Sequence, residues 1–205
     1  MPVDFLEQGV RKFKHVAFRR HRGLFRKLAR TQSPRVLFIT CADSRIVPEL
    51  ITQTRPGDLF VERNPGNIVP VYDRHTSGES ASVEYAVEVL KVEHVIVCGH
   101  SDCGAIEGML HPGKLAAIPA VKDWLVYGNR SRKMLGRAKG MPEQEKLARL
   151  TEYNVVAQIE HLLTHPSVKR RFRRGKLALH GWVYRIRDGE ILQFDPPTGR
   201  FLPWP

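Results

Sequence analysis

Two apolar runs set the strongest limit on how this chain folds. Residues 35–40 (RVLFIT) and 94–99 (HVIVCG) are short and apolar through the middle, which is typical of strands buried on both faces. Predicted helices alternate with the strands, as in parallel sheets. The sequence therefore predicts an α/β fold with a mainly parallel central sheet, four parallel strands plus one antiparallel edge strand, flanked by helices and preceded by an N-terminal helical arm.

Local patterns predict the other elements. Residues 176–186 and 190–195 read as two strands joined by the Asp188-Gly189 turn, a hairpin that supplies the antiparallel strand. A further short strand is expected at residues 59–62. Helices are expected at residues 5–30, 46–54, 80–90, 101–110 and, for the most part, 119–165.

Length and cysteine usage indicate the type of protein. The 205 residues suit a single domain, residues 1–205, in which residues 1–34 form the arm. No apolar run approaches the roughly 20 residues that cross a bilayer, and no signal-peptide pattern is present, so we expect a cytoplasmic protein with no membrane partner. Three cysteines are too few for a disulfide framework; in a reducing compartment they are thiols, thiolates or metal ligands.

The chain is strongly basic, with a formal net charge of +12. The excess is concentrated in residues 1–35, which have ten Lys or Arg against Asp4 and Glu7, and in residues 169–176 (KRRFRRGK). Such patches can bind nucleic acid or anionic membranes, so a basic-surface binding or scaffold protein is one alternative function. No helix-turn-helix, zinc-finger or aromatic RNA-binding signature accompanies the charge, and we expect solvated surfaces and no nucleic-acid partner.

Three possible metal ligands fall at one edge of the expected sheet. Cys41 directly follows the first apolar run, and His100 and Cys103 lie just past the second. Ligands of open parallel sheets bind beyond the carboxyl ends of the strands. Zinc accepts thiolate and imidazole ligands, and three protein ligands leave the fourth position open, as in catalytic sites. Spacing alone leaves two alternatives: three unrelated buried side chains, or a reactive Cys103 thiol at a helix N-terminus.

Three neighbouring residues are interpreted differently. Cys98 lies inside the second apolar run, so we expect a small buried side chain rather than a ligand. Asp43 and Arg45 follow Cys41 by two and four positions. An arginine beside a carboxylate keeps it ionised and fixes its direction, so Asp43 could hydrogen-bond a water at the metal or compete for the open position. The alternative is an ordinary surface ion pair.

These residues occur in a pattern that resembles a known family. The segments CADSR (residues 41–45) and HSDCG (residues 100–104) are similar to the paired motifs of the β-class carbonic anhydrases. Similarity continues, in order and spacing, through PGDLFVERNPGNIVPVYD, ESASVEYAVEVLKVEHVIVCGHSDCGAI and LALHGWVYRIRDGEILQFDPPTGRF. The resemblance implies one Zn²⁺ per chain held by Cys41, His100 and Cys103, with Asp43 and Arg45 as the catalytic dyad.

The resemblance also implies substrate-binding residues. Gln32 matches a glutamine that hydrogen-bonds bicarbonate or CO2, and Gly104 matches a glycine whose backbone faces the substrate. Phe60 and Tyr85 match aromatic residues that line an apolar pocket, typically supplied by the partner subunit; without the resemblance we would interpret both as core residues. The implied assembly is a homodimer or higher homo-oligomer in which the arm of residues 1–34 packs on the neighbour.

Three positions bear on the branch of the family. Members with a regulatory, non-catalytic bicarbonate pocket tend to have a tryptophan and a glycine where this chain has Phe38 and Thr40. The chain therefore resembles the plant-type branch, whose zinc site stays open. Plant members usually have a small aliphatic residue at the position of Pro65, where this chain departs from the pattern.

The implied activity is the zinc-dependent, reversible hydration of carbon dioxide to bicarbonate and a proton. Carbon disulfide and carbonyl sulfide are also linear molecules, and a zinc ion held by the same ligands could hydrolyse them. A hydrolase of these sulfur compounds on the same zinc site is therefore an alternative that the sequence leaves open.

Overall fold

The structure is a computed structural model that describes residues 3–73, 77–136 and 140–204. Residues 137–139, part of the expected helical stretch 119–165, lie outside the described residues. The chain divides into two compact units, Met1–Ser33 and Pro34–Pro205, each with its own internal contacts.

The N-terminal unit is helical, as expected. Its segments are α1 (Asp4–Lys12), η1 (Phe13–Ala17), α2 (Phe18–Arg20) and α3 (Arg22–Leu28). The helix is interrupted at His21, whose backbone leaves the helical region at φ −110° and ψ 21°. Phe13, Phe18 and Phe25 form an aromatic cluster with ring centroids between 5.3 and 6.2 Å apart. This cluster ties the two sides of the interruption together.

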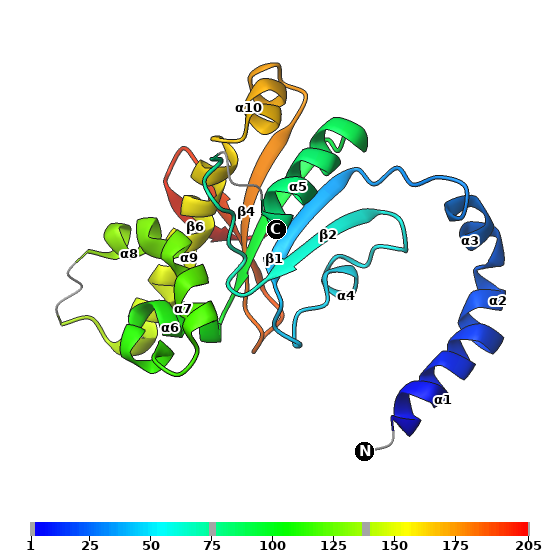
Figure 1. Cartoon of the computed structure of the whole chain (residues 1–205), viewed down its shortest axis with the longest axis horizontal. Coiled ribbons are helices and arrows are strands. Elements are labelled where there is room, and N and C mark those ends of the chain that lie inside the picture. Colours follow the sequence, from blue (N-terminus) through cyan, green and yellow to red (C-terminus); the bar gives the residue numbers. More distant parts are fainter. Residues whose placement is uncertain (1–2, 74–76, 137–139, 205) are drawn as a thin grey trace. The chain divides into compact units, whose positions relative to one another are not determined.

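The second unit is built on one six-stranded sheet (Figure 1). Its strands are β1 (Val36–Cys41), β2 (Leu59–Asn64), β3 (His94–His100), β4 (Ala178–Tyr184), β5 (Ile191–Asp195) and β6 (Arg200–Pro203). They lie in the order β2-β1-β3-β4-β5-β6; the first four are parallel, and β5 and β6 are antiparallel to their neighbours. The expected fold and terminal hairpin are confirmed, and the antiparallel edge has one more strand than we expected.

The additional strand, β6, has a weak sequence signal for physical reasons. It contains only four residues and ends at Pro203, which cannot donate a ladder hydrogen bond. Its pairing with β5 places Phe201 opposite Phe194, with ring centroids 5.3 Å apart. Tertiary packing, rather than intrinsic propensity, therefore makes this segment a strand.

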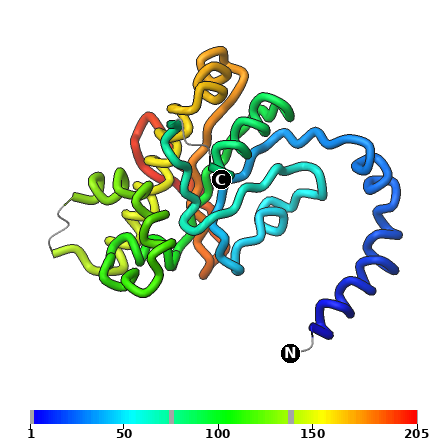
Figure 2. Tube along the Cα trace, viewed as in Figure 1, coloured from blue at the N-terminus to red at the C-terminus, as the bar shows by residue number. Residues whose placement is uncertain are grey.

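Helices flank the sheet, and Figure 2 follows the chain through them from the blue N-terminus to the red C-terminal strands. They are α4 (Pro48–Thr52), α5 (Gly78–Glu84), η2 (Tyr85–Val89), α6 (Gly104–Leu110), η3 (Pro112–Leu115), α7 (Pro119–Trp124), η4 (Leu125–Gly128), α8 (Asn129–Leu135), α9 (Glu143–Leu162) and α10 (Pro166–Arg173). The long helix α9 packs on β3 and β4. Nowhere in the described parts of the chain is a helix long and apolar enough to cross a bilayer.

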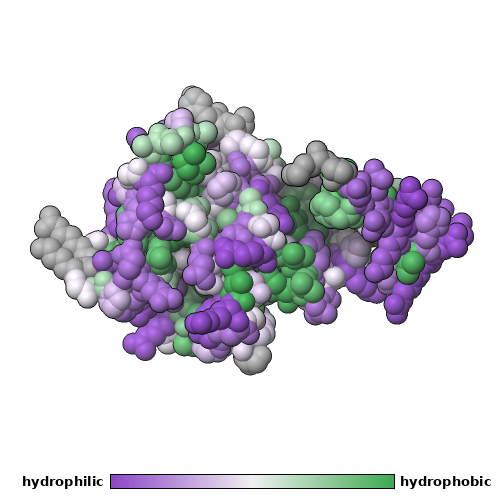
Figure 3. Space-filling view, turned by 90° about the horizontal axis from the view of Figure 1, so that it is seen from below, coloured by the Kyte–Doolittle hydropathy of each residue, from purple (hydrophilic) through white to green (hydrophobic). Residues whose placement is uncertain are grey.

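The main core lies between α9 and the sheet. Val97, Val155 and Val183 belong to it and are at most 6% exposed. A second cluster includes Ile106 of α6 and Leu125 of η4. On the face shown in Figure 3 the surface is mostly hydrophilic, with hydrophobic residues gathered in a few patches.

Parallel pairing brings the ends of β1 and β3 to one edge of the sheet. Thr40 lies opposite Cys98 in the register, so the ends of both strands, Cys41 and His100, are close together. Cys103 lies three residues further on and immediately precedes α6. The topology thus gathers residues that are far apart in sequence at one place.

We predict that Gly181→Ala in β4 lowers the free energy of unfolding by about 1–3 kcal/mol, because it overpacks the core. A Cβ there would lie 2.8 Å from Val155 Cγ1, 3.0 Å from Ile159 Cδ1 and 3.2 Å from Phe194 Cβ. The measurement is urea unfolding. Gly78→Ala, whose Cβ meets nothing within 4 Å, is the control and should stay within about 0.5 kcal/mol of the parent. Equal stability of the two variants would contradict the packing of α9 on β4.

Candidate metal centre

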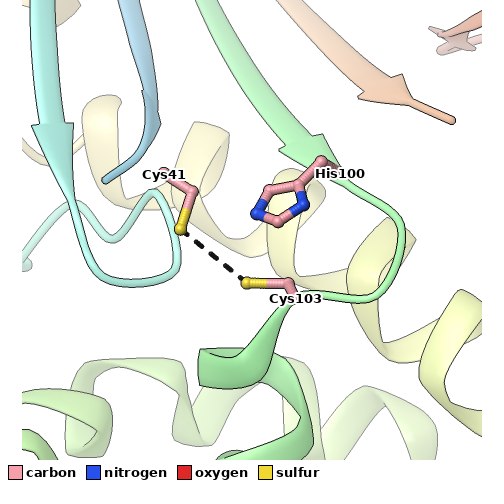
Figure 4. Close-up of side chains that lie close together, drawn as sticks. All are labelled: Cys41, His100 and Cys103. Atoms are coloured by element: carbon pink, nitrogen blue, oxygen red, sulfur yellow. Dashed lines mark hydrogen bonds between the residues drawn. The ribbon is translucent and has the colours of Figure 1, made fainter. Parts of the chain in front are cut away.

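Cys41, His100 and Cys103 form a buried cluster, as predicted (Figure 4). Their sulfur and nitrogen ligand atoms all lie within 4.8 Å of one another, and the two Sγ atoms are 3.9 Å apart. The three residues are 5%, 1% and 4% exposed. Two strand ends and the start of a helix therefore deliver three soft ligands to one point.

The ring of His100 has the orientation of a metal ligand. Its Nδ1–H donates a hydrogen bond of 2.8 Å to Ser101 O, which leaves the lone pair on Nε2. Nε2 is buried and has no hydrogen-bond partner among the described residues. The Asp43 Oδ2 atom is 3.9 Å away, beyond hydrogen-bond distance. An unsatisfied buried polar atom costs about 1–3 kcal/mol, so this nitrogen suits a bound cation.

The Sγ atoms of Cys41 and Cys103 are close enough for one thiol to donate to the other sulfur. The pKa of Cys41 is lowered to about 4, first by the contact with the Cys103 thiol and further by backbone N–H groups such as that of Gly66, while burial opposes the shift. The pKa of Cys103 is raised by its bond to Cys41, by burial and by the negative charge of the first thiolate. A divalent cation would stabilise both sulfurs as thiolates, with release of their protons. The residues present thus fit zinc, which binds thiolate and imidazole.

The remaining cysteine, Cys98, is outside the cluster, as expected. It is fully buried among Phe38 and Ile96. Burial raises the pKa of its thiol to about 12, so it stays protonated and inert.

Asp43 and Arg45 form a two-point ion pair beside the cluster. Arg45 donates from Nε to Asp43 Oδ1 at 2.9 Å and from Nη2 to Oδ2 at 2.7 Å, and its backbone N–H also binds Oδ1 at 3.0 Å. Arg45 Nη2 further donates to Asp102 O at 2.9 Å. The pair is therefore tied to the segment between His100 and Cys103.

This geometry sets the charge of Asp43. Hydrogen bonds from Arg45 hold the pKa of the Asp43 carboxyl well below its usual range, although partial burial opposes the shift. A carboxyl group with a lowered pKa stabilises the folded state above its ordinary pKa of about 3.9, and this contribution is lost as the pH falls through the lowered value. Asp43 therefore remains a carboxylate throughout the neutral and mildly acidic range.

The other predicted site residues lie at different distances from the cluster. Gly104 is the first residue of α6, directly after Cys103. Phe60 and Tyr85 lie together, with ring centroids 6.0 Å apart, but Phe60 pairs with Leu37, four positions before Cys41 in β1. That offset is roughly 13 Å along the strand, so this aromatic pair is away from its own chain's cluster.

Gln32 belongs to the other compact unit, Met1–Ser33. Its predicted contact with substrate stays a prediction.

Sequence reasoning missed two groups that support the cluster. Arg63 donates from Nε to Cys41 O at 3.2 Å and from Nη2 to Asp43 O at 2.8 Å. The Gly66 N–H lies 3.4 Å from Cys41 Sγ. The RNPGN segment, residues 63–67, belongs to a stretch that resembles the family, but nothing in its residue types showed which sulfur or carbonyl it would contact.

Comparisons with known proteins agree with this site. A family model described as carbonic anhydrase matches residues 36–191. A carbonic anhydrase of Pseudomonas aeruginosa is 47% identical over 194 residues, which cover 95% of this chain and 88% of that protein. The solved structure of the β-carbonic anhydrase CcaA is 41% identical with a TM-score of 0.96, covering 98% of this chain and 92% of that one.

A more distant solved structure extends the likeness. It is one of two tetrameric β-carbonic anhydrases from the fungus Sordaria macrospora, 31% identical with a TM-score of 0.81 over 93% of this chain and 95% of that one. Taken with the match of the family model, these relatives show that the chain belongs to the carbonic anhydrase family, and its fold is that of the β class. The reaction of this family is the zinc-dependent, reversible hydration of carbon dioxide, as the resemblance implied.

We predict that the purified protein contains about one zinc per chain, and that Cys41→Ser and Cys103→Ser each lose most of it, because two sulfurs and one nitrogen hold the ion. Cys98→Ser is the matched control: it changes an equally buried cysteine outside the cluster. Metal analysis after extensive dialysis gives the result. Full zinc in Cys41→Ser, or its loss in Cys98→Ser, would contradict the assignment.

Proposed function

We propose that Cys41, His100 and Cys103 hold a catalytic zinc ion and that Asp43 and Arg45 form the dyad that directs the hydration of CO2. One observation carries this proposal: the buried His100 Nε2, which has no hydrogen-bond partner among the described residues, lies beside two sulfurs that are 3.9 Å apart, and the Asp43 carboxylate is 3.9 Å from it. When bound, zinc supplies the Lewis acidity that makes water a strong nucleophile near neutral pH.

Asp43 orients the attacking water. Its carboxylate is ionised at every pH at which the enzyme would operate, so it accepts a hydrogen bond from the water and aims an oxygen lone pair at the carbon of CO2. Its lowered pKa makes it a poor proton acceptor. Its role is therefore to accept a hydrogen bond rather than to act as a general base.

Arg45 keeps this carboxylate from competing for the metal. It binds both oxygens of Asp43, with two side-chain bonds and one backbone bond. With both of its oxygens engaged, Asp43 would leave a zinc ion held by Cys41, His100 and Cys103 open to water. This arrangement supports the plant-type branch that Phe38 and Thr40 indicate.

Four further residues are proposed to bind substrate. Gln32 and the backbone of Gly104 hydrogen-bond the oxygens of the forming bicarbonate. Phe60 and Tyr85 make a dry wall suited to an apolar gas. The distance of this aromatic pair from its own cluster supports a role at the cluster of a partner subunit.

A homo-oligomer, at least a dimer, follows from that role. In the arm of residues 1–34, Phe5 is 73% exposed and Val10 is 66% exposed, an apolar surface that a neighbouring subunit would cover. The relative from Sordaria macrospora is tetrameric, which also favours self-association. We therefore propose that the arm packs on the partner.

We predict that the zinc-loaded protein hydrates CO2 in stopped-flow assays, with a rate that rises with pH, and that Asp43→Asn lowers the rate by roughly 100-fold while keeping zinc, because the attacking water is no longer oriented. Asp188→Asn is the control because Asp188 forms a similar arginine pair, Arg185 Nη2 to Asp188 Oδ2 at 2.7 Å. It should retain the parental rate.

Two results would count against the proposal. An Asp43→Asn protein as fast as the parent would remove the dyad from the mechanism. A zinc-loaded parent that fails to hydrate CO2 but releases hydrogen sulfide from carbonyl sulfide would favour the alternative substrates.

A mixed dimer tests whether the aromatic pair acts on the partner's zinc. Cys41→Ser and the double variant Phe60→Ala/Tyr85→Ala should each be nearly inactive alone. Co-expressed with distinct tags and purified as a mixed dimer, they should regain up to half of the parental activity, since one metal site then meets one intact aromatic wall. A mixed dimer as inactive as its parents would show that the pair acts within its own chain, and a fully active Phe60→Ala/Tyr85→Ala parent would remove the pair from the mechanism.

A further inference from the structure

Polar side chains of α9 hold the backbone of the loop that follows β2. Asn154 Nδ2 donates to Gly66 O at 2.9 Å, and Gln158 Oε1 accepts from Val69 N–H at 2.9 Å. The two amides are also joined, because Gln158 Nε2 donates to Asn154 Oδ1 at 3.0 Å. One helix face thus binds the loop at two points with a single connected pair of side chains.

Two histidines further along the chain, in α9 and in the turn after it, also bind the loop. His161 Nδ1–H donates to Val69 O at 2.7 Å, and His165 Nε2–H donates to Pro70 O at 3.0 Å. Burial lowers the pKa of both imidazoles, so they bind as neutral donors. The backbone of the loop is therefore attached to α9 and to the turn after it at Gly66, Val69 and Pro70.

This network lies in the protein interior. Asn154 and Gln158 are 0% exposed, so no bulk water can replace a lost bond. Buried polar groups are costly unless every partner is present, and apolar residues would fill the same space at lower cost. The connected amide pair at this place indicates that the position of the loop backbone matters, in addition to the stability of the fold.

The loop that Asn154 and Gln158 hold also contacts the cluster of Cys41, His100 and Cys103. Gly66, whose carbonyl Asn154 holds, points its N–H at Cys41 Sγ at 3.4 Å. Gly66 has φ +81°, and a Cβ on it would lie 3.1 Å from the Cβ of Ala105, two residues after Cys103. The loop is wedged between the two segments that bear the cysteine ligands.

We propose that Asn154 is a positioning residue of the metal centre: by holding Gly66 O, and being held by Gln158, it keeps the Gly66 N–H on the sulfur of Cys41. This inference rests on the zinc site proposed above. An N–H donor stabilises the thiolate and fixes its direction, as outer-shell partners of metal ligands do. Without Asn154 the carbonyl of Gly66 is released, and the Gly66 N–H is held less firmly on the sulfur.

The test compares metal release and metal-ligand spectra in Asn154→Leu, which has a similar volume and no amide, with those of the parent. We expect zinc transfer to a chromophoric chelator to be about 10-fold faster or more, the usual size of an outer-shell effect. In the cobalt-substituted protein, we expect the thiolate-to-cobalt charge-transfer band to shift. Both readouts are independent of catalysis.

Thr151→Val is the matched control. Thr151 is buried on the same helix and donates to Leu147 O at 2.8 Å, so the variant loses a buried hydrogen bond without touching the loop. It should release zinc at the parental rate even if its thermal stability falls. If Asn154→Leu does not fold, Gln158→Met replaces it, because this change removes the amide that holds Asn154.

The outcomes separate this inference from the proposed function. Parental zinc release and an unchanged cobalt spectrum in the folded Asn154 or Gln158 variant would overturn the inference, whether or not the parent hydrates CO2. Faster release and a shifted band in a protein that lacks CO2 hydration would support the inference and contradict the proposed function.

Discussion

Two thiols and an imidazole are buried within 4.8 Å of one another, and the proposed chemistry of this protein depends on that arrangement. Such a group is unfavourable by itself: the two sulfurs face each other at 3.9 Å in a buried place, and the His100 Nε2 atom has no hydrogen-bond partner in the described structure. A divalent cation removes both difficulties, since it accepts the nitrogen lone pair and offsets two negative charges. The metal centre is therefore a place where folding and ligand binding are linked.

The groups around the cluster act by restricting motion. Ser101 fixes the His100 ring through its carbonyl, and Arg45 fixes the Asp43 carboxylate through both of its oxygens. The Gly66 N–H meets the sulfur of Cys41. Each partner arrives from a different turn or loop at the same edge of the sheet, because β1, β2 and β3 are parallel and their carboxyl ends coincide. The parallel topology thus determines which chemistry can be assembled.

The features that depend on a local sequence pattern could be predicted from the sequence. The apolar runs predicted the parallel strands, and their ends predicted that Cys41 and His100 would meet. β6 was missed because pairing with β5 defines it, and the contact of the Gly66 N–H with Cys41 was missed because any residue but proline has an N–H. The row formed by Asn154, Gln158, His161 and His165 escaped notice because its partners are backbone atoms of a distant loop, and helical spacing alone does not identify them.

X-ray absorption at the zinc edge of the purified protein reports the atoms bound to the metal without any mutation. We expect two sulfurs at about 2.3 Å, one imidazole nitrogen at about 2.0–2.1 Å and one further light atom. A zinc shell with no sulfur, with one sulfur or with four protein ligands of another kind would contradict the assignment of Cys41, His100 and Cys103.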